Sequence, residues 1–226
     1  MRYEHVIMGR FLCRPNRFVA HVQVGEETVV CHVKNTGRCR ELFLPGAQVV
    51  LAKSRNPARK TAYDVVAVYK GDRLINIDSQ APNRVFQEWA QSGGFLPEVS
   101  LIRPEYAYGR SRLDFYVEAG GKRCLIEVKG VTLEADGHAR FPDAPTPRGA
   151  RHMRELAQAM PEGYECYAFF VIQMEGMHDF SANDVTDPAF SAALESAARQ
   201  GVHVAARGCH VTEDSIQMGE PVPVFL

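Results

Sequence analysis

The 226-residue sequence has no long hydrophobic run. Its longest apolar stretch, Cys166–Ile172, is far shorter than the roughly 20 residues that span a bilayer. Near the start of the chain, Arg10, Arg14 and Arg17 interrupt any signal-peptide core. We therefore expect a soluble, cytoplasmic protein with no membrane association.

Cysteine is scarce and widely spaced. The six cysteines include no C-x-x-C pair and no cluster with zinc-ligand spacing. Most lie within apolar runs, where cysteine packs as a small hydrophobic residue, so we expect reduced core thiols. The 18 glycines and 13 prolines are too few and too dispersed for a collagen-like or low-complexity chain.

The net charge of −1 excludes a uniformly cationic nucleic-acid coat, but the average hides an asymmetry. Residues 1–82 hold 13 Lys/Arg against 7 Asp/Glu, whereas residues 83–226 hold 13 against 20. Such a division suggests that one part meets an anion and the other has a different task, although two domains can also differ by chance.

The first 81 residues alternate in hydrophobicity as β structure does. Phe18–Val24 places alternate apolar residues on one face, and Gly25-Glu26-Glu27 turns the chain. Further strands are predicted at Thr28–Val33, Gln48–Lys53, Thr61–Tyr69 and Arg73–Asp78. Five short strands with turn signals and no long helix favour an OB-like barrel, with an SH3-like barrel as the alternative.

Two loops between these strands are rich in basic residues. They carry Lys34, Arg38, Arg40, Lys53, Arg55, Arg59 and Lys60. Binding residues commonly lie on loops of a rigid scaffold, and clustered cations neutralise phosphates with release of counterions. These residues are therefore candidate DNA-binding positions, against the alternative of a merely solvated surface.

Residues 82–226 mix helices with strands. A helix is predicted at Asn83–Gln91, a second begins at Thr146-Pro147, and a third covers Pro188–Gln200. Strands are predicted at Val99–Tyr106, Arg112–Glu118, Arg123–Lys129, Tyr164–Gln173 and Val202–Ala206. This order indicates a three-layer domain with a mixed sheet, so we expect an α/β (α+β) chain with domains at 1–81 and 82–226.

Gly120-Gly121 is a strong two-residue hairpin turn. With these residues as the loop, Phe115 faces Ile126, and every pair on that strand face is apolar: Leu113 with Val128, Phe115 with Ile126 and Val117 with Cys124. A slip of one residue would destroy this match, so the hydrophobic pattern supports the register.

The same register sets Asp114 opposite Glu127, with Lys129 on the same face. Two facing carboxylates repel unless both are solvated or a divalent cation lies between them. Carboxylate oxygens suit Mg²⁺ or Mn²⁺, and such an ion beside an ammonium can support hydrolysis of a phosphodiester. The sequence thus offers Asp114, Glu127 and Lys129 as catalytic candidates, the two acids as metal ligands, and a solvated charged face as the alternative.

Other residues could assist such a site. Glu105 ends the preceding strand and could be a further metal ligand or a solvated strand-end charge. Gln173 ends a long apolar strand, where it could orient water or mark the edge of the core. Arg148, Arg151 and His152 start a helix, a place suited to phosphate, although an ordinary polar helix face gives the same pattern. His152 could also protonate a leaving oxygen.

Six sequence runs, in order along nearly the whole chain, resemble the sugar fermentation stimulation protein A (SfsA) family. They are Asn35-Thr-Gly-Arg38, Glu41-Leu-Phe-Leu-Pro-Gly46, Arg59-Lys-Thr-Ala-Tyr63, Ser111-Arg-Leu-Asp-Phe115, Glu127-Val-Lys-Gly-Val-Thr-Leu133 and Phe141-Pro-Asp-Ala-Pro-Thr-Pro-Arg-Gly149. One departure is Cys39, where methionine is expected, and the exchange is a soft apolar one.

The resemblance implies an OB-like DNA-binding barrel followed by a domain similar to the PD-(D/E)xK nucleases. Asp114, Glu127 and Lys129 match the signature of that superfamily. The family name refers to an effect on sugar utilisation genes, notably those for maltose, and names no chemistry.

The function expected from the sequence is non-specific DNA binding, single- or double-stranded, with an Mg²⁺-dependent nuclease site. No helix-turn-helix is recognisable, which disfavours operator recognition. The alternative is a non-enzymatic DNA-binding regulator with a vestigial nuclease fold, and the barrel could also bind RNA. A homodimer remains open.

Overall fold

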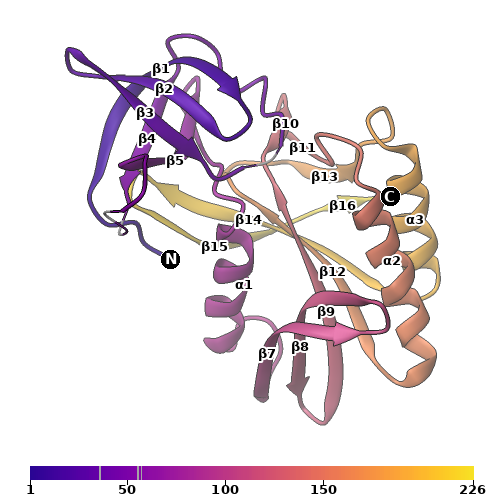
Figure 1. Ribbon diagram of the computed structural model, residues 1–226. Coiled ribbons are helices and arrows are strands. Elements are labelled where there is room, and N and C mark those ends of the chain that lie inside the picture. The colour runs from indigo at the N-terminus through magenta and orange to yellow at the C-terminus, as the bar shows by residue number, and fades with distance from the viewer. Residues whose placement is uncertain (36, 55, 57) are drawn as a thin grey trace.

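The computed structural model describes residues 1–226 apart from 36, 55 and 57, and it begins with a β-barrel (Figure 1). The barrel strands are β1 (Val6–Asn16), β2 (Val19–Val24), β3 (Glu27–Val33), β4 (Gln48–Lys53) and β5 (Tyr63–Lys70). They hydrogen-bond in the order β3-β2-β1-β4-β5, and β3 pairs with β5 to close the ring. The strand β6 (Arg73–Asn76) extends the sheet beyond β5.

The strand β1 is missing from the sequence prediction, which began the barrel at residue 18. Hydrophobic alternation along β1 is poor because Arg10 and Cys13 are exposed and the pairing with β2 shifts register twice. At Gly9 the two strands approach so closely that a Cβ would lie 2.4 Å from a Val22 methyl group. A side chain at this position would push β2 out of the barrel wall.

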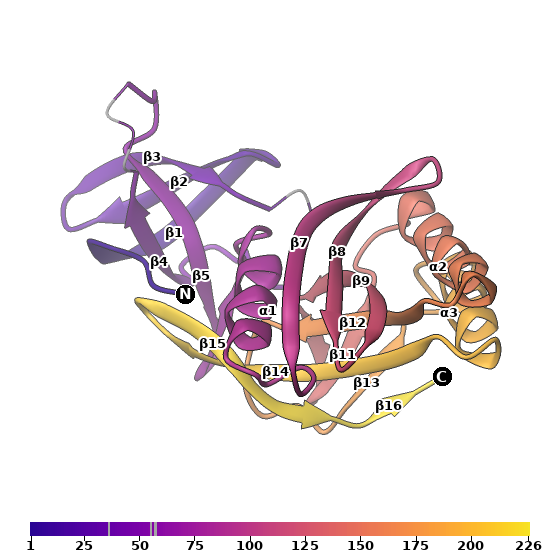
Figure 2. The same ribbon diagram turned by 90° about the horizontal axis from the view of Figure 1, so that it is seen from below.

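The rest of the chain forms a six-stranded mixed sheet with helices on both faces (Figure 2). Its strands, in spatial order, are β15 (Ser215–Val222), β14 (His203–Thr212), β12 (Glu165–Ile172), β9 (Lys122–Val131), β8 (Ser111–Ala119) and β7 (Val99–Tyr108). The strand β12 runs parallel to β9 and β14, and the outer pairs are antiparallel. The three-layer arrangement with a mixed sheet is confirmed.

Alternate residues of the central strands bury the two sheet faces against different helices. The helix α1 (Ala81–Gln91) packs Val85 and Phe86 against Ile126 and Phe169 on one face. The opposite face carries Leu125 and Phe170 and is covered by α2 (Pro147–Ala159) and α3 (Pro188–Arg199). Along β9, odd and even positions therefore point to different helices.

The starts of α2 and α3 are joined by one carboxylate. Thr146 caps α2 by accepting a hydrogen bond from the Gly149 amide at 3.2 Å, as the Thr-Pro signal predicts. Asp187 caps α3 by accepting from the Phe190 amide at 3.0 Å through Oδ1. Its other oxygen accepts from the Thr146 amide at 2.7 Å, so the two helix starts share this side chain.

A small second sheet lies beside the main one and is absent from the sequence prediction. It contains β10 (Leu133–Ala135), β11 (His138–Phe141), β13 (Asp179–Ala182) and β16 (Val224–Phe225), and the short 3₁₀ helix η1 (Met160–Glu162) follows α2. Strands of two to four residues carry too little periodicity to be recognised. No helix in the described residues combines the length and apolarity needed to cross a membrane.

The barrel and the main sheet share a continuous core and are also tied by buried polar groups. Glu134 on β10 is 5% exposed and accepts hydrogen bonds from Lys70, at 2.5 Å, and Arg73, at 2.7 Å, both from the barrel side. Burial alone would raise the pKa of Glu134, but Lys70, the Gly137 amide and Arg73 outweigh it and lower that pKa. This cluster therefore couples the two parts through charge.

Substituting Glu134→Gln should destabilise the folded protein by about 2 kcal/mol at neutral pH, because charge-assisted hydrogen bonds are lost. The folded pKa of Glu134 lies below its unfolded value, so its contribution is complete above the unfolded pKa and disappears as the pH falls through the folded pKa. Urea denaturation of both proteins should therefore show a difference that shrinks at acid pH.

A matched control is Glu195→Gln, which removes an exposed pair with Arg199 on α3. That change should cost no more than about 0.5 kcal/mol. A Glu134→Gln difference that stays the same across the pH series would contradict the assigned role of the carboxylate.

Candidate active site

The β8–β9 hairpin has the register that its hydrophobic pattern predicts. Gly120 and Gly121 have φ values of 54° and 76°, the pair of positive angles that a tight two-residue turn requires. Phe115 pairs with Ile126, and the ladder continues from there to Ala119 and Lys122. The apolar face is confirmed except at Leu113, which packs in the cluster that contains α2 instead.

The hairpin ladder ends at Phe115 and Ile126, so the predicted pairing of Asp114 with Glu127 is not part of it. Asp114 uses its side chain in place of the backbone: Oδ2 accepts a hydrogen bond from the Val128 amide at 2.8 Å. Its Oδ1 accepts from the Asn83 amide group on α1 at 2.8 Å. The two strands therefore separate at this point, and the Asp114 carboxylate is held in a fixed orientation between β9 and α1.

Glu127 lies on the face of β9 that is turned toward α2. Its side chain is 2% exposed, and Oε1 contacts both the Lys129 ammonium and the His152 ring nitrogen Nδ1. The other oxygen, Oε2, is buried and has no hydrogen-bond partner among the described residues. A buried acceptor of this kind is costly, so it marks a position where a ligand would be stabilised.

The pKa values of the two acids move in opposite directions. Burial raises the pKa of Asp114, and the nearby Glu127 charge raises it further. Burial would also raise the pKa of Glu127, but Lys129 and His152 outweigh that effect and lower it. Glu127 therefore ionises more readily than Asp114, and a bound cation would favour ionisation of Asp114.

These two carboxylates fit a hard divalent cation, on the evidence of the partnerless Glu127 oxygen and the neighbouring Asp114 charge. Glu105 does not join them. Its side chain is 63% exposed, lies 3.6 Å from Arg112 and belongs to a residue with a positive φ of 56°. Within the described residues, no set of three or more His, Cys, Asp or Glu is arranged to hold a metal.

Gln173 lies at the barrel junction, next to Gly130. Its amide nitrogen donates to the Asn76 side chain at 2.9 Å and to the Asp78 carbonyl at 3.1 Å, both from the barrel side. A Cβ on Gly130 would lie 2.5 Å from the Gln173 side-chain oxygen. Gln173 therefore connects the barrel to the strand that carries Glu127 and Lys129, and its role in catalysis stays a prediction.

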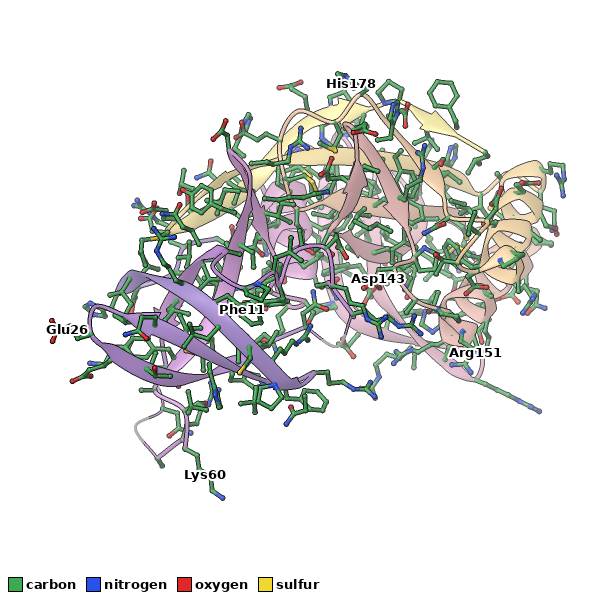
Figure 3. The ribbon with its side chains drawn as sticks, turned by 90° about the horizontal axis from the view of Figure 1, so that it is seen from above. Phe11, Glu26, Lys60, Asp143, Arg151 and His178 are labelled. Atoms are coloured by element: carbon green, nitrogen blue, oxygen red, sulfur yellow. The ribbon has the colours of Figure 1, made fainter. Side chains whose placement is uncertain are left out.

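The predicted DNA-binding cations divide into neutralised and unpaired groups. Lys34 and Arg59 form ion pairs with the buried Asp64, at 3.5 Å and 2.8 Å. Arg38 and Arg40 are exposed, and no ion pair involves them in the described part of the chain. Lys53 and Lys60 are also exposed, and Lys60 projects from the barrel loop away from the main sheet (Figure 3). Arg55 lies outside the described residues.

On α2 the three predicted phosphate contacts have different surroundings. Arg148 and Arg151 are exposed, and Arg151, labelled in Figure 3, lies 4.0 Å from Glu155 one turn further along the same helix. His152 is only 2% exposed, so its prediction as a surface contact for DNA is wrong. Helical periodicity turns it inward, where its Nδ1 faces Glu127 and the Arg148 Nε lies 3.3 Å from its Nε2.

Asn83 is not among the predicted site residues because a single asparagine in a helix carries no signal of its purpose. Only the packing of α1 against the sheet brings it to Asp114. The prediction of core thiols is wrong at Cys13, which is exposed on the unpredicted strand β1.

Two family models match this fold in succession. The model described as "SfsA N-terminal OB domain" matches residues 12–77, and that described as "Sugar fermentation stimulation protein RE domain" matches residues 80–215. The chain belongs to the sugar fermentation stimulation protein family. The resemblance seen in the motifs is confirmed, and so is the OB identity of the barrel over the SH3-like alternative.

Family members align over their whole length. A sugar fermentation stimulation protein homolog of Desulfitobacterium hafniense (strain DSM 10664 / DCB-2) is 52% identical, over 100% of this chain and 99% of its own. One from Clostridium beijerinckii is 49% identical, over 100% of both chains. The solved structure of Pyrococcus furiosus SfsA in complex with Ca²⁺ has a TM-score of 0.91 and 26% identity, covering 100% of this chain and 98% of that one.

Glu127→Gln should lower the pKa of Asp114, because the like charge that raises it is removed. Asn83→Ala should raise the Asp114 pKa further, since the hydrogen bond from Asn83 favours the ionised form. Carboxyl titration by NMR measures both. Glu105→Gln is the control and should leave the Asp114 titration in place. Equal shifts from Glu105→Gln and Glu127→Gln would refute the arrangement.

Proposed function

We propose that this protein is a divalent-metal-dependent nuclease that hydrolyses phosphodiester bonds of nucleic acid held by the barrel. The observation that carries the proposal is the buried Glu127 side chain. One of its oxygens is contacted by Lys129 and His152, and the other has no hydrogen-bond partner in the described structure. The Asp–Glu–Lys set also matches the PD-(D/E)xK signature.

The proposed metal ligands are Asp114 and Glu127, with Mg²⁺ or Mn²⁺ as the ion. The P. furiosus structure in complex with Ca²⁺ supports the use of a hard divalent cation in this family. When bound, such an ion lowers the pKa of water and stabilises charge on a phosphoryl group.

The neighbouring side chains prepare this chemistry. Lys129 holds Glu127 ionised and is 16% exposed, so its ammonium can also meet an incoming phosphate or position a water molecule. Asn83 and the Val128 amide fix the Asp114 carboxylate. His152 orients Glu127 from α2, and its buried ring limits the access of solvent to that carboxylate.

DNA is the proposed partner, bound through its backbone with little sequence preference. The barrel is an OB domain, a fold that commonly binds single-stranded nucleic acid in a basic groove. The exposed cations Arg38, Arg40, Lys53 and Lys60 are the proposed phosphate contacts there, with Arg148 and Arg151 on α2.

Lys129→Ala should reduce metal-dependent cleavage of DNA by about 10²–10³-fold, because a positive group is removed from the developing charge. Labelled single-stranded and duplex DNA would be incubated with Mg²⁺ or Mn²⁺, with EDTA as the blank. Lys122→Ala is the matched control, since Lys122 starts the same strand but is exposed and paired with Glu165. It should retain full activity.

No metal-dependent product from the unaltered protein, or equal product from Lys129→Ala, would reject the nuclease proposal. DNA binding that persists without any product would instead identify a non-enzymatic DNA-binding protein.

Mg²⁺ or Ca²⁺ should stabilise the folded protein by about 2.7 kcal/mol at a free concentration about 100 times the Kd. Asp114→Asn should abolish this gain. The pKa of Asp114 is raised, so Asp114 becomes protonated at pH values where an ordinary aspartate is still ionised. The stabilisation by the metal ion should therefore weaken as the pH falls through that range. Thermal unfolding over a pH series tests this, and a gain that Asp114→Asn leaves intact would place the ion elsewhere.

A further inference from the structure

An arginine-lined cavity opens at the junction between the barrel and the loop that precedes α2. We call it the arginine pocket; it has a volume of about 780 Å³ and includes Arg14, Arg17, Arg38, Arg40, Ala144 and Pro145 in its wall. No carboxylate lines it among the described residues. In that same part of the chain, no ion pair neutralises any of the four arginines. A concave, unneutralised group of guanidinium ions is suited to an anion.

The floor of the arginine pocket is built by Arg14. Its guanidinium donates to the backbone carbonyls of Arg17 at 2.6 Å and Arg38 at 2.9 Å, and it lies 4.8 Å from the centre of the Phe43 ring. Further bonds to the carbonyls of Asn35 and Gly37 join the loop after β3 to the β1–β2 turn. Arg14 therefore fixes the backbone at Arg17 and Arg38 before any ligand arrives, which lowers the entropic cost of binding.

The side chains of Arg17 and Arg38 remain available. Both are exposed, and their side chains take no part in a hydrogen bond with another described residue. Asp143, an acidic group close to this loop, is already engaged: its Oδ2 accepts from the Arg38 amide at 2.9 Å. Asp143 lies between the barrel and the main sheet, where Figure 3 labels it.

The arginine pocket continues toward the candidate active site. A second cavity of about 400 Å³ shares Arg17, Gly37, Ala144 and Pro145 with it. The far wall of this second cavity is formed by chain neighbours of the site residues: Gly130 follows Lys129, Pro82 precedes Asn83, and Thr146 caps the helix that carries His152. The two cavities adjoin at these shared residues, and together they form a trough from the four arginines to Gly130 on β9, with Asp143 in the wall of its second part.

We infer that this trough binds a single nucleic-acid strand, with Arg17 and Arg38 holding its phosphates, and leads that strand to Glu127. Cavities of roughly 300–1,000 Å³ enclose small-molecule-sized ligands, which corresponds to a few nucleotides of an unpaired strand. A duplex would need an open surface along its length. The direction toward Glu127 rests on the proposed nuclease function, whereas the binding of a single strand does not.

The test is binding of labelled oligonucleotides by fluorescence anisotropy, in EDTA so that no hydrolysis intervenes. The probes are an oligothymidylate of about 12 nucleotides, within the roughly 4–16 nucleotides that OB folds cover, and a duplex hairpin of similar size. The variant is Arg17→Ala with Arg38→Ala. The control is Arg103→Ala with Arg199→Ala, which removes the same charge from exposed positions on β7 and α3.

The Arg17/Arg38 variant should lose about 1.4 from the salt slope for the single strand, or about 0.7 for each phosphate contact. This corresponds to roughly 25-fold weaker binding at about 0.1 M salt. Binding of the duplex should change by less than about threefold, and the control pair should bind as the unaltered protein does. Arg17→Lys with Arg38→Lys keeps the charge but loses the planar guanidinium. Its affinity for the single strand should therefore lie between those of the alanine variant and the unaltered protein.

Several results would overturn the inference. One is unchanged single-strand binding in a variant with a normal thermal midpoint; another is an equal loss for duplex and single strand, which would indicate a general polyanion surface. Competition by millimolar inorganic phosphate as effective as the oligonucleotide would indicate an isolated phosphate site instead. A protein that binds the strand in this way but never cleaves it would refute the nuclease function alone, leaving the trough in place.

Discussion

The pairing of β8 with β9 is the constraint on which the candidate site depends. Two glycines with positive φ permit a turn of only two residues, and that turn fixes which residues face each other. The ladder ends at Phe115 and Ile126, and just beyond it the Asp114 side chain takes the Val128 amide, near enough to Glu127 for that charge to raise the Asp114 pKa. The helices on either face then supply Asn83 and His152 to the two acids.

Two of the buried acids, Glu134 and Glu127, differ in how completely they are compensated. Glu134 has both oxygens occupied by cations from the barrel, and the Gly137 amide adds a further bond. Glu127 has Lys129 and His152 on one oxygen, and no described residue bonds to the other. Removing a charge from water is costly unless its partners are complete, so Glu134 has the partners of a structural contact, whereas the incomplete set at Glu127 is the basis of the proposed metal site.

The sequence predicts those parts of the fold that local patterns determine. Thr146-Pro147 marks the start of α2, and Gly120-Gly121 sets the hairpin that ends at Phe115 and Ile126, the chain neighbours of Asp114 and Glu127. The strand β1 and the small sheet escape prediction because exposed charges, register shifts or very short length remove the period-two signal.

Contacts that depend on how the helices pack likewise cannot be predicted from the sequence. The sequence fits a surface position for His152 as well as the buried position that the packing of α2 on the sheet gives it, facing Glu127. Nor does the sequence indicate that Asn83 binds Asp114. Composition identifies the two basic loops of the barrel. Only the tertiary structure shows that Arg59 is neutralised by Asp64, whereas no described residue forms an ion pair with Arg38. Arg14 holds the loop together through long-range bonds to carbonyls that no motif encodes.

The shared cap at Asp187 links the starts of two helices that are far apart in the chain. One of its oxygens fixes the first turn of its own helix, and the other holds Thr146, from which the helix bearing His152 departs. The orientation of an imidazole against Glu127 is therefore set in part by a carboxylate that comes 35 positions later in the chain. The surroundings of Glu127 therefore draw on segments that are far apart in the chain, from α1 to the start of α3.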